Sequence, residues 1–314
     1  MKRGEEYSSF RFPAGAVGQN VGRDLERHGS KIASSVLLRG NSFIFEVFTM
    51  KIKTVATGFL LLAVFSAQGA VEDLLVKADS LFEQRSAVFD TARILADVAN
   101  VNQSISLYEK VLATSADAKV RNEAAWKILQ ASFFKAMFTT AVVKEKVKLF
   151  SEGVAVGEKL VDEFPESVAV NCWFGIVLGY QGEYDSKINS AKNGIPGRVR
   201  KIAEKVIALD PEYLDAGGYR MYGRLHYIVP AVPLVMSWPS KKKSVTYLEK
   251  ACAIAPDNLF NELYLAEVLL DRKQTERAVG ILESIVHTGG IRHGIALDTF
   301  IKRQAKLLLE KASP

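Results

Sequence analysis

The sequence has few of the residues, and none of the short motifs, that usually carry chemistry. It contains two cysteines and four histidines in 314 residues, and neither a C-x-x-C pair nor the H-E-x-x-H spacing of a zinc site occurs. It also lacks the G-x-x-x-x-G-K-S/T and G-x-G-x-x-G loops that cradle phosphates, and the G-x-S-x-G turn that presents a nucleophilic serine. We therefore expect a protein that is not an enzyme and holds no cofactor and no metal.

A strong excess of charge of one sign is also missing from most of the chain. The formal net charge is +6, but nine of the 41 basic and five of the 35 acidic residues precede residue 71, which leaves 32 and 30 for the remainder. Proteins that bind nucleic acid concentrate basic residues on one surface. A nearly neutral body with interspersed charges does not indicate nucleic acid as a partner.

The two cysteines, Cys172 and Cys252, each lie in an apolar stretch with helical periodicity. In an oxidising compartment they could form a disulfide. Two buried thiols that stay unpaired are at least as good an interpretation, because free cysteine behaves as a small apolar side chain. The sequence leaves both alternatives open.

A leader with the three parts of a secretory signal peptide covers residues 50–70. Residues 50–53 (MKIK) form a short basic start, residues 54–66 (TVATGFLLLAVFS) are apolar, and residues 67–70 (AQGA) are small and suit signal peptidase. The apolar run is too short to span a bilayer comfortably, so a retained membrane anchor is the weaker interpretation. No cysteine follows it, which does not support a lipid anchor. We expect export to the periplasm, with cleavage after Gly69 or Ala70.

Because a signal peptide should begin near the true N-terminus, residues 1–49 are interpreted as a non-native N-terminal extension, a translated stretch upstream of Met50. The expected mature protein is a single domain over residues 71–314. Its composition supports a folded body, since 48% of the chain is hydrophobic and it contains only nine prolines.

A short sequence recurs along that domain, at the end of successive predicted helices. Residues 248–250 (LEK) return 34 residues later as residues 282–284 (LES), and related copies stand at residues 108–110 (YEK) and 203–205 (AEK). A period of 34 is typical of the tetratricopeptide repeat (TPR), a helix–turn–helix unit that stacks into a solenoid. The predicted fold class is all-α, with tetratricopeptide-like helical-hairpin repeats forming a compact α-solenoid, and such solenoids usually bind partners.

Apolar periodicity adds further helices. Residues 119–140 and 143–162 read as two helices, and residues 167–180 are apolar all round, which predicts burial between neighbours. Residues 181–197 (QGEYDSKINSAKNGIPG) are polar and glycine-rich, and are interpreted as a functional loop or an insertion on the edge of the solenoid. Residues 295–311 predict a terminal helix with a charged face.

Small residues mark one helix crossing in the last third. Leu265 and Ala266 stand nine and ten residues after Pro256, and Ala278 follows twelve residues after Ala266. Two alanines at these positions would let the helices approach closely.

One interval breaks the period. The copies at residues 203–205 and 248–250 are 45 residues apart, and the extra length includes residues 228–239 (IVPAVPLVMSWP), an apolar segment with three prolines. Proline disfavours a helix here, and so apolar a segment needs a cover.

Around this insertion the chain resembles the T component of tripartite ATP-independent periplasmic (TRAP) transporters, the TatT family. The resemblance is carried by residues 208–270, with Gly218-Tyr219-Arg220 and Gly223-Arg224-Leu225 before the insertion and Leu265-Ala266-Glu267 after it. Trp173-Phe174-Gly175 also fits. The resemblance implies a homotrimer that binds the periplasmic solute-binding protein of a TRAP transporter, and a cavity for a small hydrophobic ligand. The alternative is a general TPR scaffold for periplasmic or outer-membrane protein assembly.

Aromatic and arginine side chains supply the candidate ligand-binding or partner-binding residues. Tyr219, Tyr222 and Trp238 beside the insertion could line a ligand channel, although core packing of the repeats is the more ordinary interpretation. Arg220 and Arg224 lie one helical turn apart and could clamp a carboxylate ligand, whereas a structural salt bridge is the simpler alternative. The candidate site residues are Trp173, Tyr219, Arg220, Tyr222, Arg224 and Trp238.

Overall fold

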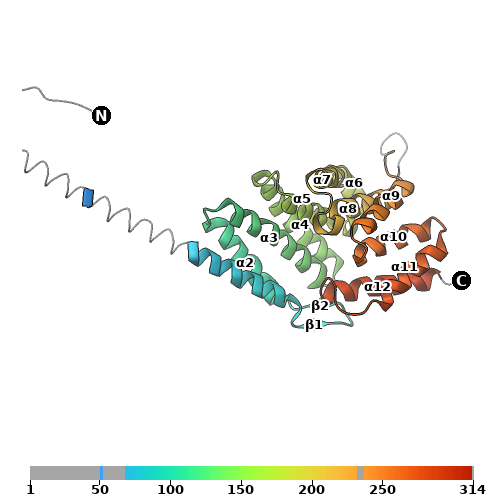
Figure 1. The fold of residues 1–314 in the computed structure, drawn as a ribbon, viewed down its shortest axis with the longest axis horizontal. Helices are drawn as coiled ribbons and strands as arrows, with labels where there is room; N and C mark the ends of the chain where they lie inside the picture. The colour runs from blue at the N-terminus through green and yellow to red at the C-terminus, as the bar shows by residue number, and fades with distance from the viewer. Residues whose placement is uncertain (1–49, 52–67, 232–236, 313–314) are drawn as a thin grey trace, which may run out of the picture. The chain divides into compact units, whose positions relative to one another are not determined.

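Helix after helix in the computed structural model turns back on its predecessor, so that the chain advances as a series of antiparallel hairpins (Figure 1). The structure describes residues 50–51, 68–231 and 237–312. The chain divides into two units, Met1–Ser66 and Ala67–Pro314. Of the first unit only residues 50–51 are described, in a helix. The predicted extension at 1–49 and the apolar run at 54–66 therefore lie outside the described residues.

The second unit is built almost entirely of α-helices. A helix is described over residues 68–83, and the 3-10 turn η1 (Gln84–Ser86) and two short antiparallel strands, β1 (Phe89–Asp90) and β2 (Leu95–Ala96), follow it. The remaining helices are α2 (Ala99–Thr114), α3 (Ala118–Phe138), α4 (Val143–Glu163), α5 (Val168–Tyr184), α6 (Lys187–Lys192), α7 (Ile195–Leu209), α8 (Tyr213–Ile228), α9 (Lys241–Ile254), α10 (Leu259–Asp271), α11 (Thr275–His287) and α12 (Ile295–Ala312).

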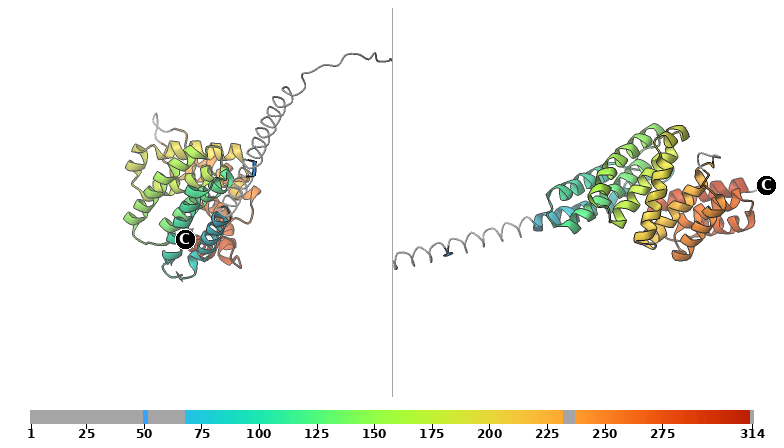
Figure 2. Two further views of the ribbon diagram at one scale, coloured as in Figure 1. Left: turned by 90° about the vertical axis from the view of Figure 1, so that its left-hand side faces the viewer. Right: turned by 90° about the horizontal axis from the view of Figure 1, so that it is seen from above.

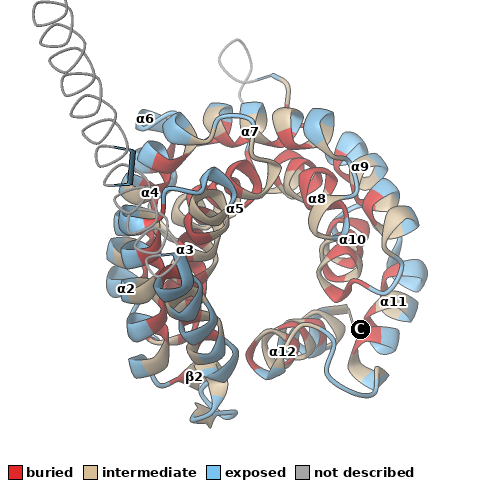
Figure 3. Ribbon diagram, turned by 60° about the vertical axis from the view of Figure 1, so that its left-hand side comes forward, coloured by how far each residue is buried: buried red, intermediate tan, exposed pale blue. Residues whose placement is uncertain are grey.

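The helices form two layers. Helices α3, α5, α8, α10 and α12 line the inside of a curved body, and α2, α4, α7, α9 and α11 lie outside them (Figure 3). The right-hand view of Figure 2 shows the same progression along the unit, from the N-terminal helices in blue-green to the C-terminal helices in red. The predicted all-α solenoid of tetratricopeptide-like hairpins is confirmed. Helix α5 packs against α3, α4, α7 and α8, as expected for a helix that is apolar on every side.

The start and the end of this solenoid meet. The ring of Phe138, at the end of α3, packs edge-to-face on Phe300 of α12 at 6.2 Å between centroids. Arg303 of α12 donates a hydrogen bond of 2.7 Å to the backbone carbonyl of Ala92, between the two strands. Helix α12 therefore contacts the helices that precede it in the sequence, and it also contacts the N-terminal part of the unit.

Polar side chains fix where several helices begin. Asp117 accepts hydrogen bonds from the backbone N–H groups of Lys119 and Val120 at the start of α3. Ser167 and Ser240 cap α5 and α9 in the same way. Each cap satisfies backbone donors that a helix leaves free at its first turn.

Most of the predicted helices lie where the sequence placed them. Helices α3, α4 and α12 match the stretches at 119–140, 143–162 and 295–311 within three residues. The predicted crossing is confirmed, because Ala266 of α10 and Ala278 of α11 are both fully buried and their helices pack together.

The prediction of a loop over residues 181–197 is wrong. Helix α5 continues to Tyr184, the short helix α6 follows, and α7 begins at Ile195. Ser186 accepts the backbone N–H of Asn189 and so starts α6. Gly194 takes a left-handed conformation, with φ of 62°, between α6 and α7. The polar residues of this stretch are cap and turn residues of helices.

The insertion separates α8 from α9. Residues 229–231 and 237–240 are described and lie outside the helices, whereas 232–236 lie outside the described residues. Cys172 is buried and Cys252 half-buried, and the two thiols are unpaired. Among the described residues, no helix has the length and apolarity needed to cross a membrane.

Candidate functional site: a cavity on the inner face of the solenoid

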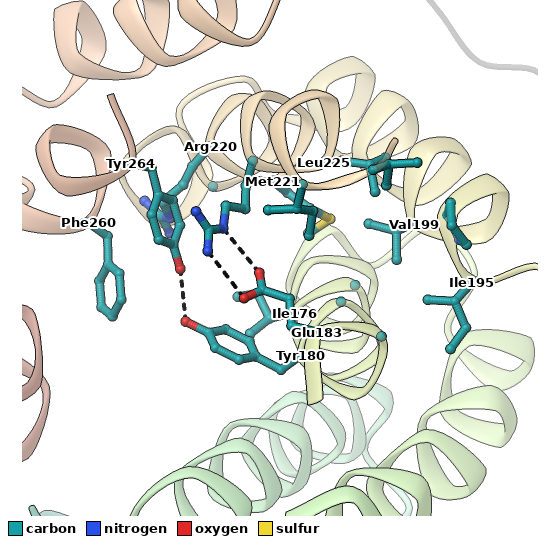
Figure 4. A pocket seen from close by; sticks show the side chains of 18 of the residues that line it. Ile176, Tyr180, Glu183, Ile195, Val199, Arg220, Met221, Leu225, Phe260 and Tyr264 are labelled. Carbon is teal, nitrogen blue, oxygen red and sulfur yellow. Dashed lines mark hydrogen bonds and ion pairs between the residues drawn. The ribbon is translucent and has the colours of Figure 1, made fainter. Parts of the chain in front are cut away.

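A cavity of about 510 Å³ opens on the inner face of the solenoid. Helices α5 and α8 form its main walls, and residues of α3, α6, α7, α10, α12 and the segments between helices complete the lining. One side is aliphatic and carries Ile195, Val199 and Leu225, and the other carries Tyr180, Phe260 and Tyr264 (Figure 4). The cavity therefore has an apolar end near α7 and an aromatic, charged end near α10.

Three glycines on α5 lie along the cavity, and one of them faces free space. Gly175, Gly179 and Gly182 all line it. A Cβ atom added at Gly179 would meet nothing within 4 Å, so that this position opens directly onto free space. A larger side chain there would start in free space on the wall of the cavity.

An ion-pair cluster lies at the charged end. Arg224 of α8 donates from Nε and Nη2 to the two carboxylate oxygens of Glu183, at 3.1 and 3.3 Å, and from Nη1 to Glu267. Burial alone would lower the pKa of Arg224, but Glu183, Tyr264 and Glu267 raise it well above its ordinary value. Arg224 thus ties α5, α8 and α10 together as a permanent cation.

Two tyrosines extend this cluster. The guanidinium of Arg224 lies 4.5 Å from the ring centroid of Tyr264, and the hydroxyl oxygens of Tyr180 and Tyr264 are 2.9 Å apart. Burial raises the pKa of Tyr264 to about 12 and that of Tyr180 well above its ordinary value. Both phenols are therefore protonated at neutral pH and share a neutral hydrogen bond.

Arg220, one turn before Arg224, stabilises an unusual piece of backbone. Leu214, Asp215 and Ala216 have φ values of 51°, 55° and 62°, in the left-handed region that L-residues rarely adopt. Arg220 donates to the carbonyl oxygens of Leu214 and Asp215 at 3.1 and 3.2 Å, and to Asn261 Oδ1 at 3.0 Å. The guanidinium that could have clamped a carboxylate ligand is bound to the protein's own oxygens.

Three of the predicted site residues thus line the cavity: Trp173, Arg220 and Arg224. The other three lie elsewhere. Tyr219 and Tyr222 are buried and stack on Tyr247 of α9, at 6.4 and 4.6 Å between centroids, and Trp238 packs on His226 at 5.3 Å. These side chains fill the contact between α8, α9 and the insertion, which agrees with the core-packing alternative.

Nothing in the sequence pointed to the residues that complete the charged end. Glu183 fell in a stretch interpreted as a loop, and Phe260 and Tyr264 were not among the predicted site residues. Arg224 meets Glu183 and Glu267 from helices 41 and 43 residues away in sequence. Among the described residues, no group of three or more His, Cys, Asp or Glu side chains could hold a metal ion.

His226, which packs against the rings of Tyr222, Trp238 and Tyr247, makes stability depend on pH. It is 2% exposed, its Nδ1 accepts the backbone N–H of Ser240 at 3.2 Å, and its Nε2 has no hydrogen-bond partner among the described residues. Burial lowers its pKa to about 4, helped by Lys243 and Arg200 and opposed by Glu204. The imidazole is therefore neutral in the folded protein at pH values where the unfolded chain protonates it.

We expect this difference to cost about 2 kcal/mol of unfolding free energy as the pH falls from 7 to 4.5. A histidine with a lowered pKa contributes its full stabilisation at pH values above the pKa of the unfolded chain, about 6.5. This contribution is lost as the pH falls from about 6.5 to about 4. Urea denaturation at several pH values measures it. His226→Gln should show a smaller loss than the parent, and His287→Gln, at an exposed site, should not. An equal loss in the parent and His226→Gln would contradict the assignment.

The hairpin solenoid and its inner cavity define the class: a TPR-like α-solenoid protein with a cavity on its inner face. The sequence model of the family "Regulator of microtubule dynamics protein 1-3" (RMD1-3) matches residues 88–313, most of the chain. The chain belongs to this family. The resemblance to the TRAP T component stays a prediction.

Several solved structures are similar to this chain. They include a thermophilic TPR protein of Thermus thermophilus (16% identity, TM-score 0.48, covering 76% of this chain and 99% of that one). Yeast Tom70 is similar at 17% identity and a TM-score of 0.41, covering 68% of this chain and 37% of that one. The TPR2AB-domain:pHSP90 complex of yeast Sti1 is similar at 14% identity and a TM-score of 0.29, covering 79% of this chain and 100% of that one. No curated protein sequence matches the chain.

Proposed function

We propose that the protein is a non-catalytic TPR-type scaffold that contacts a protein partner and holds a small apolar ligand in its inner cavity. The cavity carries this proposal, because about 510 Å³ falls within the range of small-molecule sites. Its walls combine aliphatic and aromatic side chains with a few convergent polar groups, the usual composition of such sites.

The neutral, apolar fluorophore N-phenyl-1-naphthylamine tests this directly. It should bind the parent protein with a rise in fluorescence, and Gly179→Phe should weaken binding at least about tenfold, because the new ring takes up the free space beside α5. Gly280→Phe is the matched control, since Gly280 is an exposed position of α11 that also has nothing within 4 Å. Equal binding by all three proteins would place the fluorophore elsewhere and contradict the proposal.

A more specific partner is the solute-binding protein of a TRAP transporter, bound by a homotrimer of this chain. The resemblance over residues 208–270, with its proline-rich insertion, supports this partner. A solute-binding gene and a permease gene next to this one would favour it, and co-purification at micromolar concentration is the direct test. Light scattering tests the trimer. The family is named for microtubule dynamics, so tubulin belongs in the same binding assay.

Export through the signal peptide at residues 50–70 is the proposed route to the periplasm. The mature protein should begin at Ala70 or Val71, which N-terminal sequencing of the periplasmic fraction would establish. Recovery of a chain that still carries residues 50–70 in the cytosol would contradict export. Peptides from residues 1–49 in the natural host would contradict a start at Met50.

A further inference from the structure

The charged end of the cavity favours one kind of ligand head group. We infer that the cavity prefers apolar ligands carrying a positively charged amine over ligands carrying a carboxylate. The inference rests on the proposed function, because it concerns the chemistry of the ligand in the same cavity.

The two arginines of the cavity have little left to offer an anion. Arg224 already pairs with two carboxylates, in a two-pronged contact with Glu183 and a further contact with Glu267. Arg220 binds two backbone carbonyls and Asn261 and holds the left-handed turn at 214–216 in place. Three of the five N–H groups of each guanidinium are already used, so a ligand carboxylate would compete with these partners, and leaving a buried charge or carbonyl unpaired is costly.

The fixed charges around the cavity leave an excess of negative charge. Three carboxylates line it (Glu183, Asp185, Asp215), as do three cations (Lys187, Arg220, Arg224). Glu267 is not in the lining, but it pairs with Arg224 and adds a fourth carboxylate next to the cavity. His293, also in the lining, adds no cation at neutral pH, because burial lowers its pKa. An ammonium group entering the cavity would therefore meet one uncompensated negative charge in a partly desolvated site.

The carboxylate of Asp215 is the accessible part of this excess. Its Oδ2 accepts from Asn258 Nδ2 at 2.9 Å, and its Oδ1 accepts no hydrogen bond from the described residues. The side chain lines the cavity on the left-handed turn, beside Arg220. Oδ1 is thus available to an N–H donor of a ligand.

The aromatic rings in the lining also favour an ammonium ligand over a carboxylate ligand. Phe133, Trp173 and Phe260 line the cavity, and Trp173 lies 6.1 Å from Phe133 between ring centroids. The faces of such rings attract ammonium groups and repel carboxylates. The phenols of Tyr180 and Tyr264 stay neutral and add no negative charge.

Three ligands with the same ten-carbon chain separate the effect of the head group on affinity from that of the apolar tail. Decylammonium, 1-decanol and decanoate are titrated below their aggregation limits against protein loaded with N-phenyl-1-naphthylamine. The ammonium compound should displace the fluorophore about tenfold more tightly than decanoate, with decanol between them, as expected for one charge in a partly screened site. The difference should shrink as salt is added.

Glu183→Gln should bring the ammonium and carboxylate affinities to within about twofold of each other, because it removes the excess charge. Asp215→Asn is the second variant if the first does not fold, since an amide oxygen can still accept from Asn258. Glu158→Gln, on the outer helix α4, is the control and should keep the preference.

The outcomes separate the two proposals. Displacement by all three ligands with equal affinity, or tightest by decanoate, would overturn the ammonium preference and leave the cavity proposal standing. An unchanged preference in Glu183→Gln and Asp215→Asn would also overturn it. If neither the fluorophore nor any of the three ligands binds, the proposed function fails and the preference fails with it.

Discussion

Replacing Arg224 by methionine is expected to lower the free energy of unfolding by about 3 kcal/mol. The side chains of Arg224, Glu183 and Glu267 are 18, 25 and 27% exposed, so the cluster is largely shielded from water. Methionine fills much of the same space but leaves two carboxylates close together without their shared cation. Uncompensated buried charges of this kind typically cost several kcal/mol, and the residual exposure reduces that cost.

Urea denaturation at pH 7 measures the loss. Arg277→Met is the control, because its ion pair with Glu249 is about half exposed and surface pairs contribute little, about 0–1 kcal/mol. Adding Glu183→Gln to Arg224→Met should restore part of the stability, since one of the two unpaired charges is then gone. A loss below about 1 kcal/mol in Arg224→Met would mean that water screens the cluster far more than its burial indicates.

The parts of the fold that the sequence predicted are those that depend on local pattern. The 34-residue recurrence and the spacing of Ala266 and Ala278 follow from how one hairpin packs on itself, and any TPR-like unit repeats that geometry. The stretch at 181–197 was misjudged because serine, asparagine and glycine occur both in loops and at the caps of short helices. Only the positions of Ser186 and Gly194 relative to the neighbouring helices distinguish the two cases.

The site was predictable only in part, for a different reason. Periodicity placed Arg220 and Arg224 on one helix but could not show what they face. Arg224 faces Glu183 and Glu267, and Arg220 faces Asn261, all from other hairpins. Which residues meet across the inner face depends on how far the solenoid curves, and curvature arises from many small packing terms that no single motif encodes.

A second substitution with a large expected effect on stability lies on the face of α8 that is turned away from the cavity. Gly223 lies where α8 crosses α9, and a Cβ atom there would stand 2.6 Å from Cγ of Leu248, 3.0 Å from its Cδ2 and 3.3 Å from its backbone nitrogen. Leu248 is fully buried and cannot move aside. Gly223→Ala is therefore expected to lower the free energy of unfolding by about 3 kcal/mol, the upper end for overpacking a core.

Gly280→Ala gives the opposite expectation for the same chemical change. Its Cβ would meet nothing within 4 Å, and alanine is the better helix former, so stability should rise by up to about 1 kcal/mol. Urea denaturation of the two variants side by side separates helix propensity, which favours alanine at both positions, from the contact between α8 and α9. A gain in stability in Gly223→Ala would show that the two helices are not in contact at Leu248.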